Sequence, residues 1–143
     1  MMYEQIKALC ENETDLIANL SNISACLNMN LDQINWVGFY LMKDDQLVLG
    51  PFQGKPACVR IPVGKGVCGT CVQEKKVQRV PDVHKFPGHI ACDGASNSEI
   101  VLPIFKNDEV IGVLDIDSPV FNRFSEEDEM ILSKIVTYIE TLL

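Results

Sequence analysis

The sequence predicts one α+β domain, with an antiparallel sheet that carries both terminal helices on one face and loops around a pocket on the other. Near both ends, apolar residues recur about every 3.6 positions, as in amphipathic helices. Between them, short runs of β-branched and aromatic residues alternate with turn residues, which is typical of hairpins. The chain has 143 residues, so we expect 1–143 to form a single domain.

The first helical pattern covers about 3–27, and we expect a break near 12–14. Cys10 and Cys26 lie on or beside its apolar stripe, and we interpret them as small core residues. The last helix begins at Ser125, whose side chain and the acids that follow it form a typical N-terminal cap. Its expected buried face is Met130, Ile131, Ile135, Ile139 and Leu142.

Residues 35–42 and 47–50 predict the first β-hairpin. Strand alternation places Val37, Phe39 and Leu41 on one face, which we take as the core face. The other face carries Trp36, Gly38 and Tyr40. Two rings around a glycine favour a ligand pocket, and the alternative is that both rings are ordinary core aromatics.

The next segment is punctuated by glycine and proline. We expect a turn at 51–56 and an edge strand at 58–63, because Pro62 cannot donate to a sheet. Residues 64–72 approach a helix start but lack the spacing of a phosphate-binding loop. A short strand is expected at 77–80.

Composition excludes two classes of function. The net charge is −8, which argues against a nucleic-acid surface, because phosphate binding needs clustered Lys and Arg. The chain is 47% hydrophobic but has no apolar run long enough for a membrane span. Its start resembles no signal peptide, so we expect a cytoplasmic protein.

Six cysteines in a reducing compartment do not indicate a disulfide framework, so each is core filler, metal ligand or reactive thiol. The Cys68-x-x-Cys71 pair suggests zinc or thioredoxin-like redox chemistry. Structural zinc needs a second ligand pair at recognisable spacing, and none is present. A thioredoxin motif belongs in a βαβ unit, whereas the surrounding pattern is one of hairpins. Both interpretations are weak.

The segment 81–97 is long and irregular, and long ordered loops in compact domains are usually functional. It holds Cys92 between small residues, with His89 and Asp93 nearby and Glu99 at the mouth of the next strand. This composition differs from that of a core or a plain surface. We interpret the segment as a reaction site.

Strands expected at 100–105 and 110–116 form a second, central hairpin. Asp115 and Asp117 are two positions apart, so they share one face of the second strand. Burying two carboxylates is costly unless a cation or hydrogen-bond donors satisfy them. A ligand ammonium fits this need, and the alternative is a strand-end pair that caps the turn after Ser118.

Five segments together resemble the GAF-domain free methionine-(R)-sulfoxide reductases: 35–40 (NWVGFY), 49–54 (LGPFQG), 66–69 (GVCG), 88–93 (GHIACD) and 112–118 (GVLDIDS). The resemblance covers nearly the whole chain and is more specific than a GAF fold alone. It implies a GAF-like central antiparallel β-sheet with N- and C-terminal helices packed on one face, and a ligand pocket with loops on the other.

The resemblance implies roles for individual residues. Cys92 is the catalytic thiol, and Cys58 and Cys68 are the resolving candidates, whereas Cys71 lies outside the family's cysteine set. The substrate pocket is expected to be lined by Trp36, Glu99, Asp115 and Asp117, together with Tyr40 from the hairpin argument.

The chemistry follows from these residue types. A thiolate attacks the sulfoxide sulfur while an acid, Asp117 or Glu99, protonates the oxygen, and a sulfenic acid remains on the enzyme. Asp115 would hold the substrate ammonium and Trp36 the S-methyl group. A second thiol then forms a disulfide, which thioredoxin, with NADPH upstream, is expected to reduce. We expect no bound cofactor and no metal, and a homodimer is plausible.

Two other classes remain open. One is a GAF sensory module that binds a small ligand without chemistry, opposed by the grouping of reactive cysteines with pocket acids. The other is a redox-sensing or metal-binding regulator that uses Cys58, Cys68 and Cys92.

Overall fold

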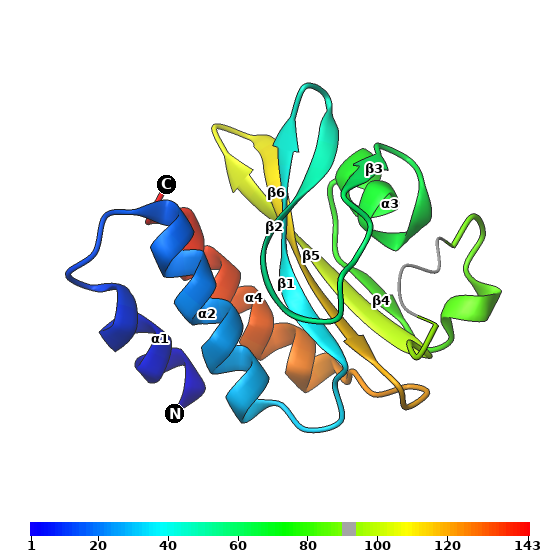
Figure 1. The fold of residues 1–143 in the computed structure, drawn as a ribbon, viewed down its shortest axis with the longest axis horizontal. Coiled ribbons are helices and arrows are strands. Elements are labelled where there is room, and N and C mark those ends of the chain that lie inside the picture. Colours follow the sequence, from blue (N-terminus) through cyan, green and yellow to red (C-terminus); the bar gives the residue numbers. More distant parts are fainter. Residues whose placement is uncertain (90–93) are drawn as a thin grey trace.

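The computed structural model describes residues 1–89 and 94–143. Its centre is a six-stranded antiparallel sheet in the order β3-β2-β1-β6-β5-β4 (Figure 1). The strands are β1 Trp36–Lys43, β2 Gln46–Gly54, β3 Arg60–Pro62, β4 Gln78–Val80, β5 Ser98–Lys106 and β6 Glu109–Ser118. The predicted α+β architecture is confirmed.

Three helices lie on one side of the sheet, and the first of them packs mainly against the other two (Figure 1). They are α1 Met2–Cys10, α2 Leu16–Asn30 and α4 Glu126–Glu140. The break expected near 12–14 separates α1 from α2, and Asp15 caps α2 by accepting a hydrogen bond from the Ala18 backbone N–H. The other face carries α3 Gly66–Glu74 and the short 3-10 helix η1 Val83–Lys85.

The sheet separates two hydrophobic cores. The helix-side core contains Val37 and Phe39 of β1 with alternate residues of β5 and β6. Cys10 and Cys26 are buried there, as the sequence predicted. The second core contains Trp36 and Tyr40 of β1 with residues of α3. Strand alternation therefore assigns each side chain of β1 to one core or the other.

Two sequence predictions about this framework were wrong. Met130 and Ile131 were expected in the buried face of α4, but their side chains are 73% and 40% exposed. The buried stripe is instead Leu132, Ile135, Val136 and Ile139, so only part of the expected face was correct.

The turn expected at 51–56 was also placed too early, since β2 continues to Gly54. The pairing shifts between Gly38, which faces Phe52, and Tyr40, which faces Leu49. This bulge absorbs Pro51, which has no N–H to donate to the sheet.

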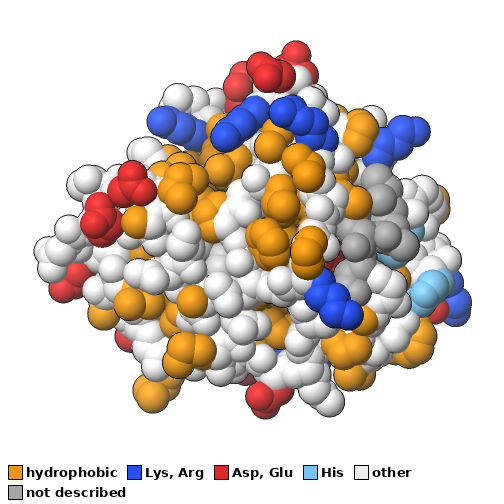
Figure 2. Space-filling view, viewed as in Figure 1, with side chains coloured by type: hydrophobic (Ala, Val, Ile, Leu, Met, Phe, Trp, Pro, Cys, Tyr) orange, Lys and Arg blue, Asp and Glu red, His pale blue; other side chains and the backbone are white. Residues whose placement is uncertain are grey.

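The surface in Figure 2 carries hydrophobic side chains gathered near its centre, with Lys and Arg side chains beside them and most acidic side chains further away. Within 1–89 and 94–143, none of the helices combines the length and apolar character that crossing a bilayer demands.

Gly38 supplies a test of this packing. A Cβ atom built at Gly38 would overlap the Cβ of Phe52 and lie 2.8 Å from the Pro51 carbonyl oxygen. We expect Gly38→Ala to lower the free energy of unfolding by about 2 kcal/mol or more in urea titrations, because the β1–β2 pair must separate. Gly94→Ala is the control, since a Cβ there meets nothing within 4 Å. Equal stability of the two variants would contradict this packing.

Candidate active site

The strand register builds a row of functional side chains across the sheet. Trp36 of β1 pairs with Asp117 of β6, and Asp117 pairs with Glu99 of β5. Two pairs further along, Gly38 faces Asp115. Because these positions alternate with the helix-side core residues, they all face the α3 side of the sheet.

A cavity lies above this row. Its lining includes six of the residues expected from sequence: Trp36, Tyr40, Cys68, Glu99, Asp115 and Asp117. Sequence reasoning did not select Lys65 and Ser96, which also line it. Lys65 lies in the glycine-rich segment that precedes α3, which was compared with a phosphate-binding loop. Ser96 lies in the irregular segment that was selected because of Cys92.

Glu99 is an acid of the cavity whose pKa is strongly perturbed. Its side chain is buried, and it lies within hydrogen-bonding reach of Asp115 and Asp117. Burial first, and then the charges of these two neighbours, raise the pKa of the Glu99 carboxyl well above its ordinary value. Glu99 therefore holds its proton to a higher pH than an ordinary carboxyl does, and it can donate that proton.

Asp115 is held differently. Burial raises the pKa of its carboxyl, whereas hydrogen bonds involving Glu99 and Cys68 lower it. Its Oδ1 atom is buried and has no hydrogen-bond partner among the described residues. An unsatisfied buried carboxylate oxygen is costly, and a cationic ligand would remove that cost. The alternative of a turn cap is not supported, because Ser118 Oγ accepts the hydrogen bond from Val120 N–H.

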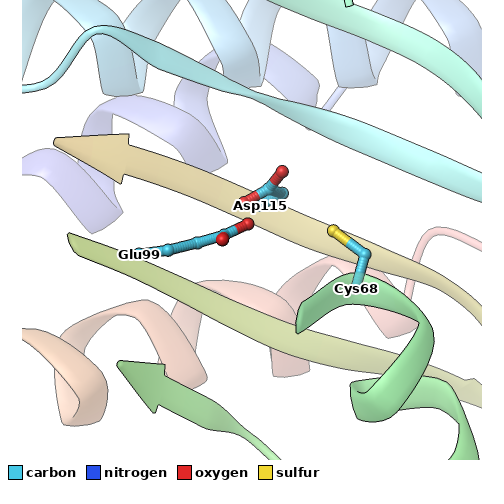
Figure 3. A group of neighbouring side chains, drawn as sticks. All are labelled: Cys68, Glu99 and Asp115. Carbon is cyan, nitrogen blue, oxygen red and sulfur yellow. The ribbon is translucent and has the colours of Figure 1, made fainter. Parts of the chain in front are cut away.

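Cys68 points from α3 toward Glu99 on β5 and Asp115 on β6 (Figure 3). One ligand atom from each of the three lies within 4.8 Å of the other two. Burial, and then the negative charges of the acids, raise the pKa of the Cys68 thiol well above its ordinary value. These three side chains together could hold a metal ion, and the expectation that none is bound stays a prediction.

Cys71, one turn further along α3, is fully buried, and its thiol lies 3.8 Å from the Val101 carbonyl oxygen. Burial raises the pKa of this thiol as well. The Cys68-x-x-Cys71 pair thus joins one cavity thiol to one core thiol, and neither is in a disulfide.

The aromatic side of the cavity differs from expectation in one respect. Gly38 was expected to leave space for a ligand between Trp36 and Tyr40. Phe52 occupies the space beside Gly38. Its ring stacks on Trp36, and the two ring centroids are 5.2 Å apart. Trp36 also stacks on Tyr40 at 5.9 Å. Trp36 and Tyr40 thus form an aromatic wall of the cavity, and Phe52 packs against Trp36.

The indole N–H of Trp36 and the hydroxyl of Tyr40 both hydrogen-bond to the loop between β2 and β3. The Trp36 indole N–H donates to the Lys55 carbonyl at 3.1 Å, and the Tyr40 hydroxyl donates to the Cys58 carbonyl at 2.8 Å. Burial, and then Asp115, raise the pKa of Tyr40, so its hydroxyl remains a donor. Cys58 itself is half-buried and disulfide-bonded.

Cys92, the expected nucleophile, lies outside the described residues. His89 lines the cavity. Burial, and then the neighbouring His84, lower its pKa, so His89 is a neutral imidazole near pH 7.

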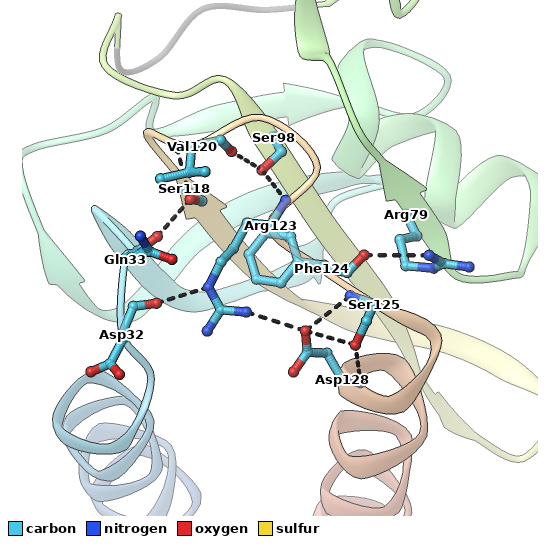
Figure 4. A network of polar contacts seen from close by, with 10 residues as sticks. All are labelled: Asp32, Gln33, Arg79, Ser98, Ser118, Val120, Arg123, Phe124, Ser125 and Asp128. Carbon is cyan, nitrogen blue, oxygen red and sulfur yellow. Dashed lines mark hydrogen bonds and ion pairs between the residues drawn. The ribbon is translucent and has the colours of Figure 1, made fainter.

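The ends of β5 and β6 beside the acids are tied to the helices (Figure 4). Ser118 Oγ donates to the Gln33 carbonyl, and Ser98 Oγ donates to the Val120 carbonyl. Arg123 then bonds the Asp32 carbonyl and the Asp128 carboxylate at 2.9 and 3.2 Å. Ser98 and Ser118 neighbour Glu99 and Asp117 in sequence, so the network fixes the strands that present those carboxylates.

Comparisons with known proteins agree with this geometry. A GAF domain family model matches residues 23–143. The free methionine-R-sulfoxide reductase of Escherichia coli is 62% identical over 95% of this chain and 82% of its own length. This chain belongs to the GAF-domain free methionine-R-sulfoxide reductase family. The family resemblance found in the sequence is confirmed.

Solved structures of this reductase family have the same fold. The reduced form of fRMsr of Staphylococcus aureus is 60% identical, with a TM-score of 0.97 over 99% of this chain and 92% of that one. A second structure, fRMsr of Staphylococcus aureus in complex with substrate, has a TM-score of 0.95 at 60% identity, over 99% of this chain and 93% of that one.

Glu99 gives the site a pH signature. In the unfolded chain Glu99 has its ordinary pKa of 4.5, so it loses its proton at a lower pH than in the folded chain. Folding stability therefore falls as the pH rises from 4.5 toward the raised pKa of the folded state. Glu99→Gln removes this effect. We expect its melting temperature, relative to the original chain, to rise by about 3 °C or more between pH 4.5 and pH 8.

The exposed Glu109 at the start of β6 provides the matched variant. Glu109→Gln should show a pH-independent difference in melting temperature. If Glu99→Gln gives the same flat profile, the proposed retention of a proton on Glu99 is wrong.

Tyr40→Phe tests the anchoring of the loop. Losing one buried hydrogen bond worth about 1 kcal/mol should raise amide exchange at Lys55, Ala57 and Val59 roughly fivefold. Hydrogen exchange with mass spectrometry, in one redox state, measures this. Tyr138→Phe on α4 is the control and should leave these amides unchanged. Identical protection in both variants would show that the Tyr40 hydroxyl does not hold the loop.

Proposed function

We propose that this chain reduces free methionine-(R)-sulfoxide to methionine, with Cys92 as the nucleophile. One observation carries the proposal: Glu99, Asp115 and Asp117 are all buried around one cavity, and Asp115 has an unpartnered oxygen. The names of the E. coli and S. aureus relatives state or abbreviate this activity.

Asp115 would bind the substrate ammonium. Its unpartnered Oδ1 offers an acceptor, and Lys65 on the cavity wall offers a positive charge for a substrate carboxylate. The face of Trp36 gives the S-methyl group an apolar surface. A free amino acid satisfies both charges at once, whereas a residue inside a peptide has neither.

Glu99 is one of the two candidate acids. Its pKa is raised by burial and by the neighbouring carboxylates, so it can protonate the sulfoxide oxygen near neutral pH. Asp117 completes the cluster and remains the second candidate.

The reaction balances in two steps. The Cys92 thiolate attacks the sulfoxide sulfur while the oxygen takes up protons, and the oxygen passes to Cys92 as a sulfenic acid when methionine leaves. The thiol of Cys58 then attacks the sulfenic sulfur, a disulfide forms, and water departs. Cys58 is favoured over Cys68 because Cys58 is disulfide-bonded, whereas Cys68 is a free, buried thiol with a raised pKa.

The cycle requires a dithiol reductant, and we propose thioredoxin, supplied by NADPH, in the cytoplasm. No bound cofactor takes part in these steps. A homodimer is proposed through the helical layer, where Leu9 of α1 and Met130 of α4 leave exposed apolar side chains.

The two rival classes differ in what the cavity would do. A GAF sensor binds its ligand and returns it unchanged, and a metal-binding regulator takes up a stoichiometric ion. Stoichiometric metal in the reduced protein would favour the regulator, for which Cys68, Glu99 and Asp115 offer a set of neighbouring ligand atoms.

Turnover with dithiothreitol as reductant tests the proposal. We expect free L-methionine-(R)-sulfoxide to be consumed and L-methionine to appear, measured by chromatography. Cys92→Ser should abolish turnover, because no thiolate attacks the sulfur. Asp117→Asn and Glu99→Gln should each lower the reductive step by about 100-fold, as expected when an acid is removed.

Cys71→Ser is the control, since the Cys71 thiol is fully buried in the core, and should keep most of the activity that its stability allows. N-acetylmethionine sulfoxide should be a poor substrate because it lacks the ammonium. Full turnover by Cys92→Ser would overturn the proposal, and so would stoichiometric zinc in the reduced protein.

A further inference from the structure

The proposed function requires a protein reductant to reach the disulfide of Cys58, and the following inference rests on that function. Cys58 lies in the loop between β2 and β3, just before the edge strand β3. Its side chain is half-buried. A thiolate attacks a disulfide along the line of the S–S bond at close range, so the incoming protein must cover the residues around Cys58.

Those residues present an apolar surface. The side chains of Val59 and Val63, which follow Cys58 closely in sequence, are 61% and 39% exposed. Pro56 and Pro62 are exposed as well. Tyr40 and Trp36 hold the loop from beneath by hydrogen bonds to the Cys58 and Lys55 carbonyls, so the surface is fixed before a partner arrives. Apolar side chains on a held loop are suited to a protein interface.

The charge around Cys58 is opposite to that of the chain. The net charge is −8, yet no acidic residue occurs between Asp45 and Glu74, and this stretch carries Lys55, Arg60 and Lys65. Lys55, Arg60 and Lys65 are exposed. Across 1–89 and 94–143, the ion pairs include none of these three cations. Figure 2 shows such basic side chains beside the central hydrophobic group.

We propose that Lys55, Pro56, Val59, Arg60 and Val63, here called the Cys58 collar, form the docking surface for a protein dithiol reductant. Its reactive cysteines would be surrounded by apolar residues with acidic residues at the rim. The apolar residues of the collar cover the reacting sulfurs. The cations of the collar attract the acidic partner, whereas the negative net charge of the rest of the chain repels it.

The exchange that the collar serves is balanced. One thiolate of the reductant attacks a sulfur of the Cys58 disulfide, the protein disulfide breaks, and a mixed disulfide forms. The second reductant thiol attacks that mixed disulfide and leaves with the first as an oxidised pair. Two electrons pass to the enzyme, whose two thiols are restored.

The test compares two reductants on the same variants. Turnover of free methionine-(R)-sulfoxide is measured with an acidic thioredoxin at increasing concentration, and separately with dithiothreitol. Arg60→Glu and Lys55→Glu should each lower kcat/KM for thioredoxin by about 3- to 10-fold, and the double variant by more. Val59→Asp should lower it similarly, because it places a charge on the apolar surface. Dithiothreitol turnover should stay within about twofold for all of them, because a small dithiol needs no docking surface.

Two controls separate the possible results. Lys106→Glu makes the same charge change at an exposed position at the end of β5 and should not alter kcat/KM for thioredoxin. Added salt should weaken thioredoxin turnover of the original chain more than that of the double variant. Unchanged kcat/KM in the collar variants, or equal losses with both reductants, would overturn the collar. An original chain that is inactive with dithiothreitol would instead overturn the proposed function, and the collar with it.

Discussion

The burial of three carboxylates on one face of one sheet is the constraint on which the rest of the site depends. Glu99, Asp115 and Asp117 cannot all carry a charge in a region from which water is excluded. They coexist because Glu99 retains a proton and shares hydrogen-bonding distance with both neighbours. The site therefore keeps an acid and an acceptor side by side, at a cost in stability that the helix-side core must offset.

The surrounding structure keeps this arrangement from relaxing. If the strands moved apart, water would enter and each carboxylate would return to an ordinary pKa. The Ser98, Ser118 and Arg123 hydrogen bonds tie the strand ends to both neighbouring helices. The aromatic wall closes the opposite side and uses its polar atoms on the loop of Cys58. Proton retention, loop position and strand spacing are thus parts of one structural unit.

Sequence patterns predicted the parts of this unit that depend on alternation and periodicity. The two-residue spacing of Asp115 and Asp117 is enough to place both on one face, and the helical stripes are enough to place both terminal helices on the other. The role of Gly38 was not predictable, because it depends on a bulge that brings Phe52 over it from the neighbouring strand. Met130 is exposed because it lies on the side of α4 away from the buried stripe of Leu132, Ile135, Val136 and Ile139.

The cysteines show the same limit in chemical terms. Cys68 and Cys71 are three residues apart on one helix, yet one faces the acids and the other a backbone carbonyl. Spacing suggested a pair, whereas their neighbours give them separate roles. What distinguishes a reactive thiol from an inert one is its local charge and solvent, and these come from segments distant in the chain.

Strand alternation also constrains how such a site can change over evolution. Trp36 of β1, Glu99 of β5 and Asp115 of β6 are each followed by a residue of the helix-side core. Deleting a single residue within β6 would turn Asp115 into the helical layer and aliphatic side chains into the cavity. Substitutions can therefore alter the chemistry of the cavity one position at a time, whereas length changes must be confined to the loops. A sheet of this kind can exchange one ligand for another across distant relatives while its helical layer stays the same.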